Sequence, residues 1–66
     1  MLENKINVWR AEKKWTQQQL ADQVGVSRQT IIALEKNKYN PSFILAAKIA
    51  NALEKPIMEV FNYKED

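Results

Sequence analysis

Residues 16–35 carry the most restrictive pattern in the chain, two short helical segments separated by its only glycine. Thr16 is suited to cap the first segment, and Gln19, three residues later, can return a hydrogen bond to the backbone of Thr16 as a capping box. Gly25 falls where this helix must end, because helices commonly end on a residue with positive φ and glycine adopts that conformation easily. Ser27 can then cap a second helix that begins directly after it. These local signals predict a helix, a tight turn and a second helix.

Apolar side chains in this stretch share one face, at the spacing expected for two helices that pack together. The small side chain of Ala21 lies where the two helices must cross closely. The larger apolar positions are Leu20, Val24, Ile31 and Leu34, with Val26 under the turn. This arrangement predicts a helix-turn-helix unit over about residues 16–36.

The opposite face of the second helix, residues 28–36, has an unusual composition for a surface that only faces water. It combines one basic, one amide and two apolar side chains, those of Arg28, Gln29, Ile32 and Ala33. Arginine can bind guanine through two hydrogen bonds, glutamine can bind adenine, and small apolar groups can contact the methyl group of thymine. These four residues are therefore candidates for base contacts in the major groove of DNA. The alternative is a surface helix in a protein that never touches DNA, since the same motif also occurs in such proteins.

Length and composition indicate one domain, residues 1–66, with an ordinary globular content of 45% hydrophobic and 27% charged residues. The chain has no cysteine and no histidine, the side chains used by most metal sites and by many nucleophilic and general-base mechanisms. We therefore expect no enzymatic activity, no metal and no cofactor. The sequence shows no signal peptide and no apolar run of membrane-spanning length, which predicts a cytoplasmic protein with no membrane partner.

Charge is distributed unevenly along the chain, although the net charge of +2 is small. Residues 1–53 contain eight Lys or Arg and four Asp or Glu, whereas residues 54–66 contain two and four. The basic part holds the helix-turn-helix unit, so we expect the acidic tail to lie away from a polyanion.

Three further helices and a short tail are expected around this unit. Their ranges are about 3 or 4 to 13, 43–53 and 56–60. The side chains expected in or against the core are Leu2, Ile6, Trp9, Trp15, Phe43, Leu45, Ala46, Ile49, Ala50 and Leu53. For the tail two alternatives stay open, a frayed end or a two-stranded ribbon in which residues 61–63 pair with residues 1–3.

Polar residues near the unit are candidates for contacts with the DNA backbone or with each other. Gln17 stands in the first turn of its helix, where free N–H groups favour an anion such as phosphate. Ser27 can cap its helix and touch a phosphate as well. Arg10 lies next to the inward stripe of the first helix, and Glu35 is the only acid between residues 23 and 53. These two are candidates for an ion pair, the alternative being that both are solvated.

Four short motifs are spread over most of the chain. They are Thr16-Gln17-x-x-Leu20-Ala21, Gly25-Val26-Ser27-Arg28-Gln29-Thr30-Ile31, Leu34-Glu35-Lys36 and Tyr39-Asn40-Pro41-Ser42. Together they resemble the phage-repressor (Cro/C1, XRE-type) helix-turn-helix family, most closely its short single-domain bacterial members. The resemblance implies an all-α, repressor-type domain of five helices with residues 28–36 as the recognition helix. Asn37 stands where the family usually has glycine, and asparagine is the next best residue for a left-handed conformation.

The resemblance also implies roles for individual residues. The position of Gln17 contacts the DNA backbone in the family, and the loop after the recognition helix does the same. In this chain that loop offers Lys38, Tyr39 and Asn40, although Tyr39 alone could instead pack on the core. Arg10 and Glu35 stand at positions that commonly form a pair.

The C-terminal part is expected to expose more apolar surface than a small monomer comfortably does. The residues concerned are Ile44, Ile57, Met58 and Phe61. A homodimer through the fifth helix and neighbouring parts of the fourth would cover them. It would also place two recognition helices about 34–36 Å apart on one side of DNA.

We therefore expect a cytoplasmic, bacterial or phage-type transcriptional regulator associated with the nucleoid. It would bind double-stranded DNA sequence-specifically, as a repressor and a homodimer on a palindromic operator (an inverted repeat). The alternative is an antitoxin-like or other interaction module that neutralises an unidentified protein partner, with DNA binding secondary.

Overall fold

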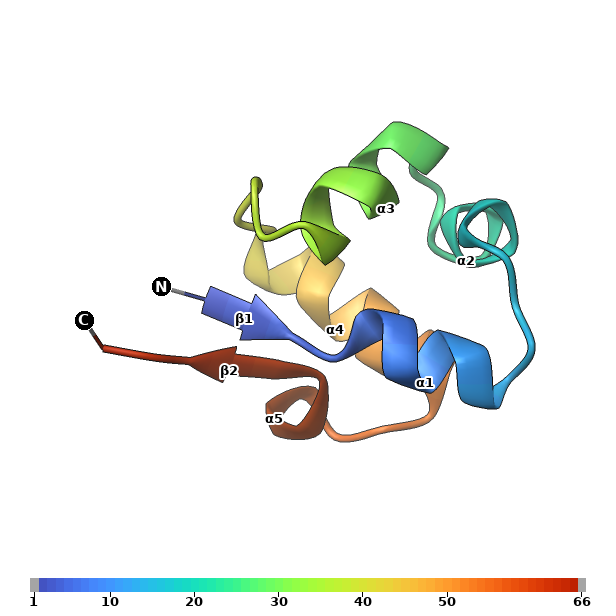
Figure 1. Cartoon of the computed structure of the whole chain (residues 1–66). Coiled ribbons are helices and arrows are strands. Elements are labelled where there is room, and N and C mark those ends of the chain that lie inside the picture. Colours follow the sequence, from blue (N-terminus) through green and yellow to red (C-terminus); the bar gives the residue numbers. More distant parts are fainter. Residues whose placement is uncertain (1, 66) are drawn as a thin grey trace.

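The computed structural model describes residues 2–65 and contains five helices and two short strands (Figure 1). In chain order these are β1 (Leu2–Asn4), α1 (Ile6–Glu12), α2 (Gln17–Val24), α3 (Arg28–Glu35), α4 (Phe43–Leu53), α5 (Ile57–Val60) and β2 (Phe61–Tyr63). Strands β1 and β2 lie side by side at one end of the molecule, so residues 2–4 and 61–63 meet there. The five-helix fold expected from the sequence is confirmed. In the described part of the chain, none of the helices has the length and apolar character needed to cross a membrane.

Hydrogen bonds that are local in sequence define α2 and α3. Thr16 Oγ1 accepts from the backbone N–H of Gln19 at 3.1 Å, and Gln19 Oε1 accepts from the backbone N–H of Thr16 at 2.8 Å, which completes the capping box. Gly25 ends α2 with a φ of 74°. Ser27 Oγ accepts from the backbone N–H of Thr30 at 3.3 Å and caps α3. The turn between the two helices is therefore set by the residues that the sequence analysis assigned to it.

One apolar core is shared by all five helices. Its largest fully buried side chains are Ile6, Leu20, Ile31, Leu34, Ile49, Leu53 and Val60. The two tryptophans pack against the edge of this core, and each is covered by a lysine. Lys55 Nζ lies 4.4 Å from the ring centroid of Trp9, and Lys13 Nζ lies 5.3 Å from that of Trp15. Lys13 also hydrogen-bonds to the exposed carboxylate of Glu54 and thereby lowers the pKa of that group.

The N-terminal residues differ from the main expectation, because residues 2–4 form a strand and α1 begins only at Ile6. The strand is antiparallel to β2, with the pairs Leu2 and Tyr63, Glu3 and Asn62, and Asn4 and Phe61. The ribbon alternative is thus confirmed with residues 2–4 in place of 1–3, and Met1 lies outside the described residues. The helix starts late because Asn4 Oδ1 accepts from the backbone N–H of Ile6 at 3.1 Å, a side-chain bond that favours the start of a helix there.

Two phenylalanines differ from the expectation in their burial, one being exposed and the other buried. Phe43 was expected in the core and is 77% exposed, whereas Phe61 was expected on an exposed dimer surface and is only 6% exposed. Phe43 is the first residue of α4, and helical periodicity gives the direction of a side chain without showing whether another element reaches the helix end. Phe61 begins β2, where its side chain is turned towards the core while the next two residues are exposed. Both expectations were therefore wrong.

Candidate nucleic-acid interface

Helix α3 packs one side against the core and exposes the other side to solvent. Ile31 and Leu34 are buried in the core below it. The four side chains expected to contact bases lie on the accessible part of the helix, with Arg28 and Gln29 exposed and Ile32 and Ala33 half-buried. A cation, an amide and two apolar groups are thus available along one helix.

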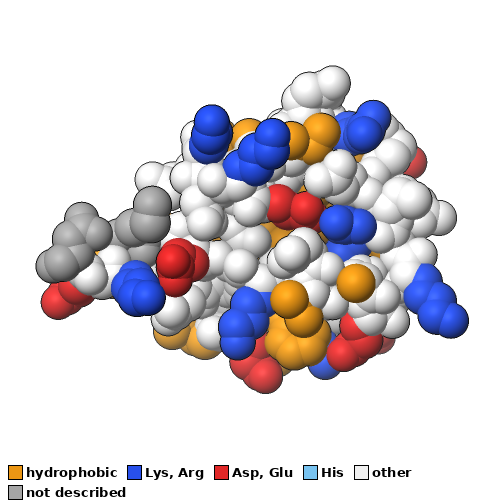
Figure 2. Space-filling model, viewed as in Figure 1, with side chains coloured by type: hydrophobic (Ala, Val, Ile, Leu, Met, Phe, Trp, Pro, Cys, Tyr) orange, Lys and Arg blue, Asp and Glu red, His pale blue; other side chains and the backbone are white. Residues whose placement is uncertain are grey.

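Positive charge lies at both ends of this face. Arg28 is exposed at the start of α3, and Lys36 and Lys38 are exposed directly after its last residue. Figure 2 shows blue side chains along the edge of the molecule over α3 and the loop after it, with orange groups between them. Red and blue groups both lie along the opposite edge. This face therefore attracts a polyanion at both ends and offers apolar groups between them.

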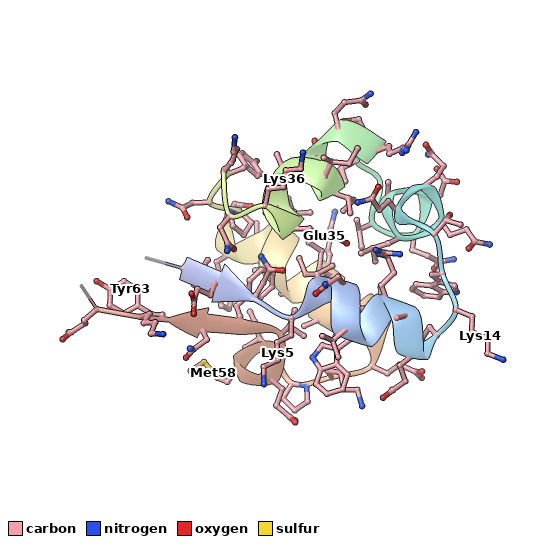
Figure 3. All side chains as sticks on the ribbon, in the orientation of Figure 1. Lys5, Lys14, Glu35, Lys36, Met58 and Tyr63 are labelled. Carbon is pink, nitrogen blue, oxygen red and sulfur yellow. The ribbon has the colours of Figure 1, made fainter. Side chains whose placement is uncertain are left out.

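Glu35, the acid of α3, points away from this face and lies between α3 and α1 (Figure 3). Its Oε2 accepts from Arg10 Nε at 2.9 Å and its Oε1 accepts from Arg10 Nη2 at 3.3 Å. Gln17 Nε2 donates to the same Oε1 at 3.1 Å, and Arg10 Nη1 donates to the carbonyl oxygen of Trp15 at 2.8 Å. The ion pair expected from the sequence therefore forms, and it joins α1, α2 and α3. The pair neutralises the charge of Glu35, although the carboxylate still lies beside Gln17.

A hollow of about 540 Å³ opens between the first turns of α2 and α3. Its lining residues are Arg10, Thr16, Gln17, Gln18 and Arg28. The guanidinium of Arg28 and the N-terminal turn of an eight-residue helix are the groups of this hollow that suit a phosphate, because the guanidinium of Arg10 is already paired with Glu35. The bond from Gln17 to Glu35 uses one of the two amide hydrogens of Gln17, so the other remains for an anion. Spacing alone did not reveal that Arg28 and Gln17 line the same hollow, because they belong to different helices.

A second, smaller hollow of about 260 Å³ lies on the accessible face of α3. It is lined by Gln29, Thr30, Ala33 and Tyr39. Tyr39 comes from the loop after α3, so the structure brings it to a residue expected to contact bases. Thr30 was not expected in the site, although its spacing of three residues from Ala33 places both on one face of α3.

The loop that follows α3, residues 36–42, begins with a well-defined helix end. Asn37 has a φ of 58°, as expected for a left-handed C-terminal residue. The backbone N–H of Lys38 donates to the carbonyl of Ala33 at 2.9 Å, and that of Asn37 donates to the carbonyl of Leu34 at 3.0 Å. These two bonds form a Schellman motif. Lys38, Tyr39 and Asn40 follow directly and are exposed, next to the face of α3.

Asn4 was not recognised as part of this region from the sequence. Its Nδ2 donates to the carbonyl oxygen of Leu34 at 2.7 Å and to Oδ1 of Asn37 at 3.1 Å. A strand residue far away in sequence thus contacts the end of α3. No local signal marks such a contact, because it depends on the pairing of the two chain ends.

Comparison with known proteins places this geometry in a family. The HTH_3 helix-turn-helix model matches residues 6–60. An uncharacterized HTH-type transcriptional regulator of Methanocaldococcus jannaschii is 49% identical over 65 residues, which are 98% of each chain. The immunity repressor of Bacillus phage phi105 is 39% identical over 49 residues, 74% of this chain and 34% of that protein. A crystal structure of a Bacteroides fragilis protein described as DNA-binding superimposes with a TM-score of 0.84 and 37% identity, covering 94% of this chain and all of that one. The chain therefore belongs to the XRE-type helix-turn-helix family of transcriptional regulators.

Proposed function

We propose that this protein is a repressor that binds double-stranded DNA sequence-specifically with α3 in the major groove. The observation that carries this proposal is the accessible face of α3, which combines a cation, an amide and two apolar side chains suited to base edges with lysines directly after the helix. The phage immunity repressor among its relatives supports repression as the mode of action.

Each residue of this face has a role that follows from its chemistry. Arg28 binds a guanine or the phosphate beside it, and Gln29 binds an adenine. Ile32 and Ala33 contact thymine methyl groups. These contacts select the sequence, because only base edges differ between one site and another.

A second set of residues fixes the protein on the DNA backbone without reading bases. The set consists of Gln17, Ser27, Lys38, Tyr39 and Asn40. Gln17 contributes an amide to the phosphate-suited hollow at the start of α2. The hydroxyl oxygen of Ser27 caps α3 and lies 3.1 Å from Thr30 Oγ1. In this proposal, Ser27 binds a phosphate with the same hydroxyl group or with its backbone N–H.

The active species in this proposal is a homodimer on an inverted repeat. Ile44 and Met58 are 68% and 79% exposed, an unusual environment for such large apolar side chains. A second copy would bury them together with the half-buried Ile57. Two-fold symmetry then requires two half-sites about one helical turn apart.

Selection from a pool of random double-stranded DNA at about 150 mM salt tests the proposal directly. We expect enrichment of an inverted repeat. For Arg28→Ala we expect a loss of about 1–3 kcal/mol and a relaxed preference at one base pair if Arg28 reads a base, or a uniform loss with a smaller salt dependence if it holds a phosphate. Lys48→Ala is the charge-matched control, because Lys48 is an exposed lysine of α4 that lines neither hollow of the interface. Binding that enriches no sequence would contradict the proposal and favour a role in capturing a protein partner.

A further inference from the structure

Asn4 connects the ribbon of the two chain ends to the interface proposed for DNA. Its amide group makes three hydrogen bonds, to the carbonyl of Leu34, to Oδ1 of Asn37 and from the backbone N–H of Ile6. Strand β1 passes beside the C-terminal end of α3 in Figure 1, which is where the first two of these bonds lie. We propose that Asn4 is a positioning residue that holds the loop of residues 36–42 in the shape that contacts the DNA backbone. This inference rests on the proposed function.

The two acceptors of Asn4 belong to the residues that decide the direction of the loop. The carbonyl of Leu34 already accepts the backbone N–H of Asn37, so Asn4 adds a second bond to that carbonyl. Asn37 is the residue with φ of 58°, where the chain leaves the helix. Asn4 therefore fixes both the backbone and the side chain of the helix end. Lys38, the first candidate for a phosphate contact, comes directly after it.

The remainder of the loop has little else to hold it. Within residues 2–65, the side chains of Lys38, Tyr39 and Asn40 make no hydrogen bond to the protein, and Tyr39 lies beside Ala33. The next hydrogen-bonded point is Ser42, which caps α4 with a 3.1 Å bond from the backbone N–H of Leu45. A loop with so few fixed points depends strongly on each of them. The point at Asn37 is the one that receives a side chain from another element.

Asn4 itself is held firmly by the C-terminal part of the chain. It pairs with Phe61, whose side chain is buried in the core, and the next residue, Lys5, donates its backbone N–H to the carbonyl of Val60 at 2.8 Å. Contacts therefore run from β2 through Asn4 to the end of α3. In consequence, the ribbon affects DNA binding although it does not itself face the groove.

A double-mutant cycle on the selected DNA site tests this role. Asn4→Ala removes the donor, and Asn62→Ala is the matched control, because Asn62 is an exposed asparagine of the same ribbon that has no side-chain hydrogen bond within the described residues. We expect Asn4→Ala to weaken binding about threefold to tenfold, the value of one or two hydrogen bonds, and Asn62→Ala to change it less than twofold. We also expect the effect of Lys38→Ala to shrink in the Asn4→Ala background while the effect of Arg28→Ala is unchanged.

A purely structural role predicts a different result. If Asn4→Ala only reduced the folded fraction, it would weaken all DNA contacts alike. On folded protein, Lys38→Ala and Arg28→Ala would then each have the same effect in the Asn4→Ala background as in the unmodified protein. Asn4→Asp provides a second variant, because its carboxylate still accepts the N–H of Ile6 but cannot donate to Leu34 or Asn37. We expect the effect of Lys38→Ala to shrink in the Asn4→Asp background as well. Circular dichroism should show that the helices are intact in this variant.

The outcomes separate this inference from the proposed function. If the unmodified protein selects no DNA sequence, the proposed function fails. If it selects a site and Lys38→Ala weakens binding equally in the unmodified and Asn4→Ala backgrounds, the role of Asn4 is refuted while the proposed function stands.

Discussion

At the scale of single residues, Glu35 belongs to α3 but accepts its hydrogen bonds from residues of α1 and α2. The side chains of Arg10 and Glu35 are 19% and 11% exposed, so the pair is shielded from water without being fully buried. Such a pair is costly to break, because the remaining charge loses its partner and cannot easily be solvated.

Glu35→Gln should therefore lower the free energy of unfolding by about 1–3 kcal/mol, somewhat less than the roughly 3–5 kcal/mol found for fully buried pairs. Urea denaturation followed by circular dichroism measures this change. Glu12→Gln is the control, because Glu12 also forms an ion pair, with Lys55 at 3.2 Å, but its side chain is 57% exposed. There we expect a loss of less than about 1 kcal/mol. Equal losses in the two variants would show that shielding of the Glu35 pair contributes nothing.

The small hollow between Ala33 and Tyr39 leads to a prediction at the same scale, which rests on the proposed function. Replacing one thymine of the selected site by deoxyuridine removes only a methyl group. A buried methyl group is worth about 0.8 kcal/mol, so binding should weaken about fourfold at the position that this hollow covers. In Ala33→Gly, which removes the methyl group of the hollow expected to contact the thymine, the same replacement should have little effect, as measured by fluorescence anisotropy. The control is the same replacement at a thymine outside the repeat. No sensitive thymine at any position would refute the contact.

At the scale of elements, the turn between α2 and α3 depends on the backbone conformation of Gly25. An added Cβ would meet no atom of a more distant residue within 4 Å, so space does not restrict this position. Its φ of 74° does, because a side chain disfavours the left-handed conformation. Gly25→Ala should therefore cost about 1–2 kcal/mol of stability in urea denaturation. Gly25→Asn should cost less, since asparagine tolerates this conformation better. A neutral Gly25→Ala would show that the turn does not need a left-handed residue.

Those elements that depend on neighbouring residues could be predicted from the sequence. Thr16, Gly25 and Ser27 mark the helix ends through bonds that span only a few residues, and all three act as expected. The ribbon remained one of two alternatives because it joins residues about 60 positions apart, and nothing local encodes such pairing. The same limit explains Phe43 and Asn4, whose environments depend on which distant element lies beside them.

In the candidate site too, features set by neighbouring residues could be predicted and contacts between elements could not. Periodicity was enough to assign Arg28 and Gln29 to the accessible part of α3. Periodicity could not show that Arg28 shares a hollow with Gln17, or that Tyr39 lies beside Ala33. Contacts between elements require the packed fold.

At the scale of the whole molecule, the proposed dimer makes a prediction about assembly. Met58 is on the surface, so Met58→Lys should leave the fold of the monomer intact. If a second copy covers this residue, sedimentation at tens of micromolar should show a dimer for the unmodified protein and a monomer for Met58→Lys, because a buried unpaired charge opposes association. Val8→Lys serves as the control, since Val8 is an exposed apolar residue of α1. An unmodified protein that is monomeric both alone and on DNA would refute the dimer.

The pairing of the two chain ends also has a consequence for the synthesis of the protein. Asn4 is made early, but Phe61, its partner in the ribbon, leaves the ribosome more than fifty residues later. The helix-turn-helix elements, whose hydrogen bonds are local, can form while the chain is still growing. The strand pairing that holds Asn4 in place must wait for residues 61–63. A chain interrupted before residue 61 would therefore have its helix-turn-helix elements without the paired strand that holds Asn4 beside the end of α3.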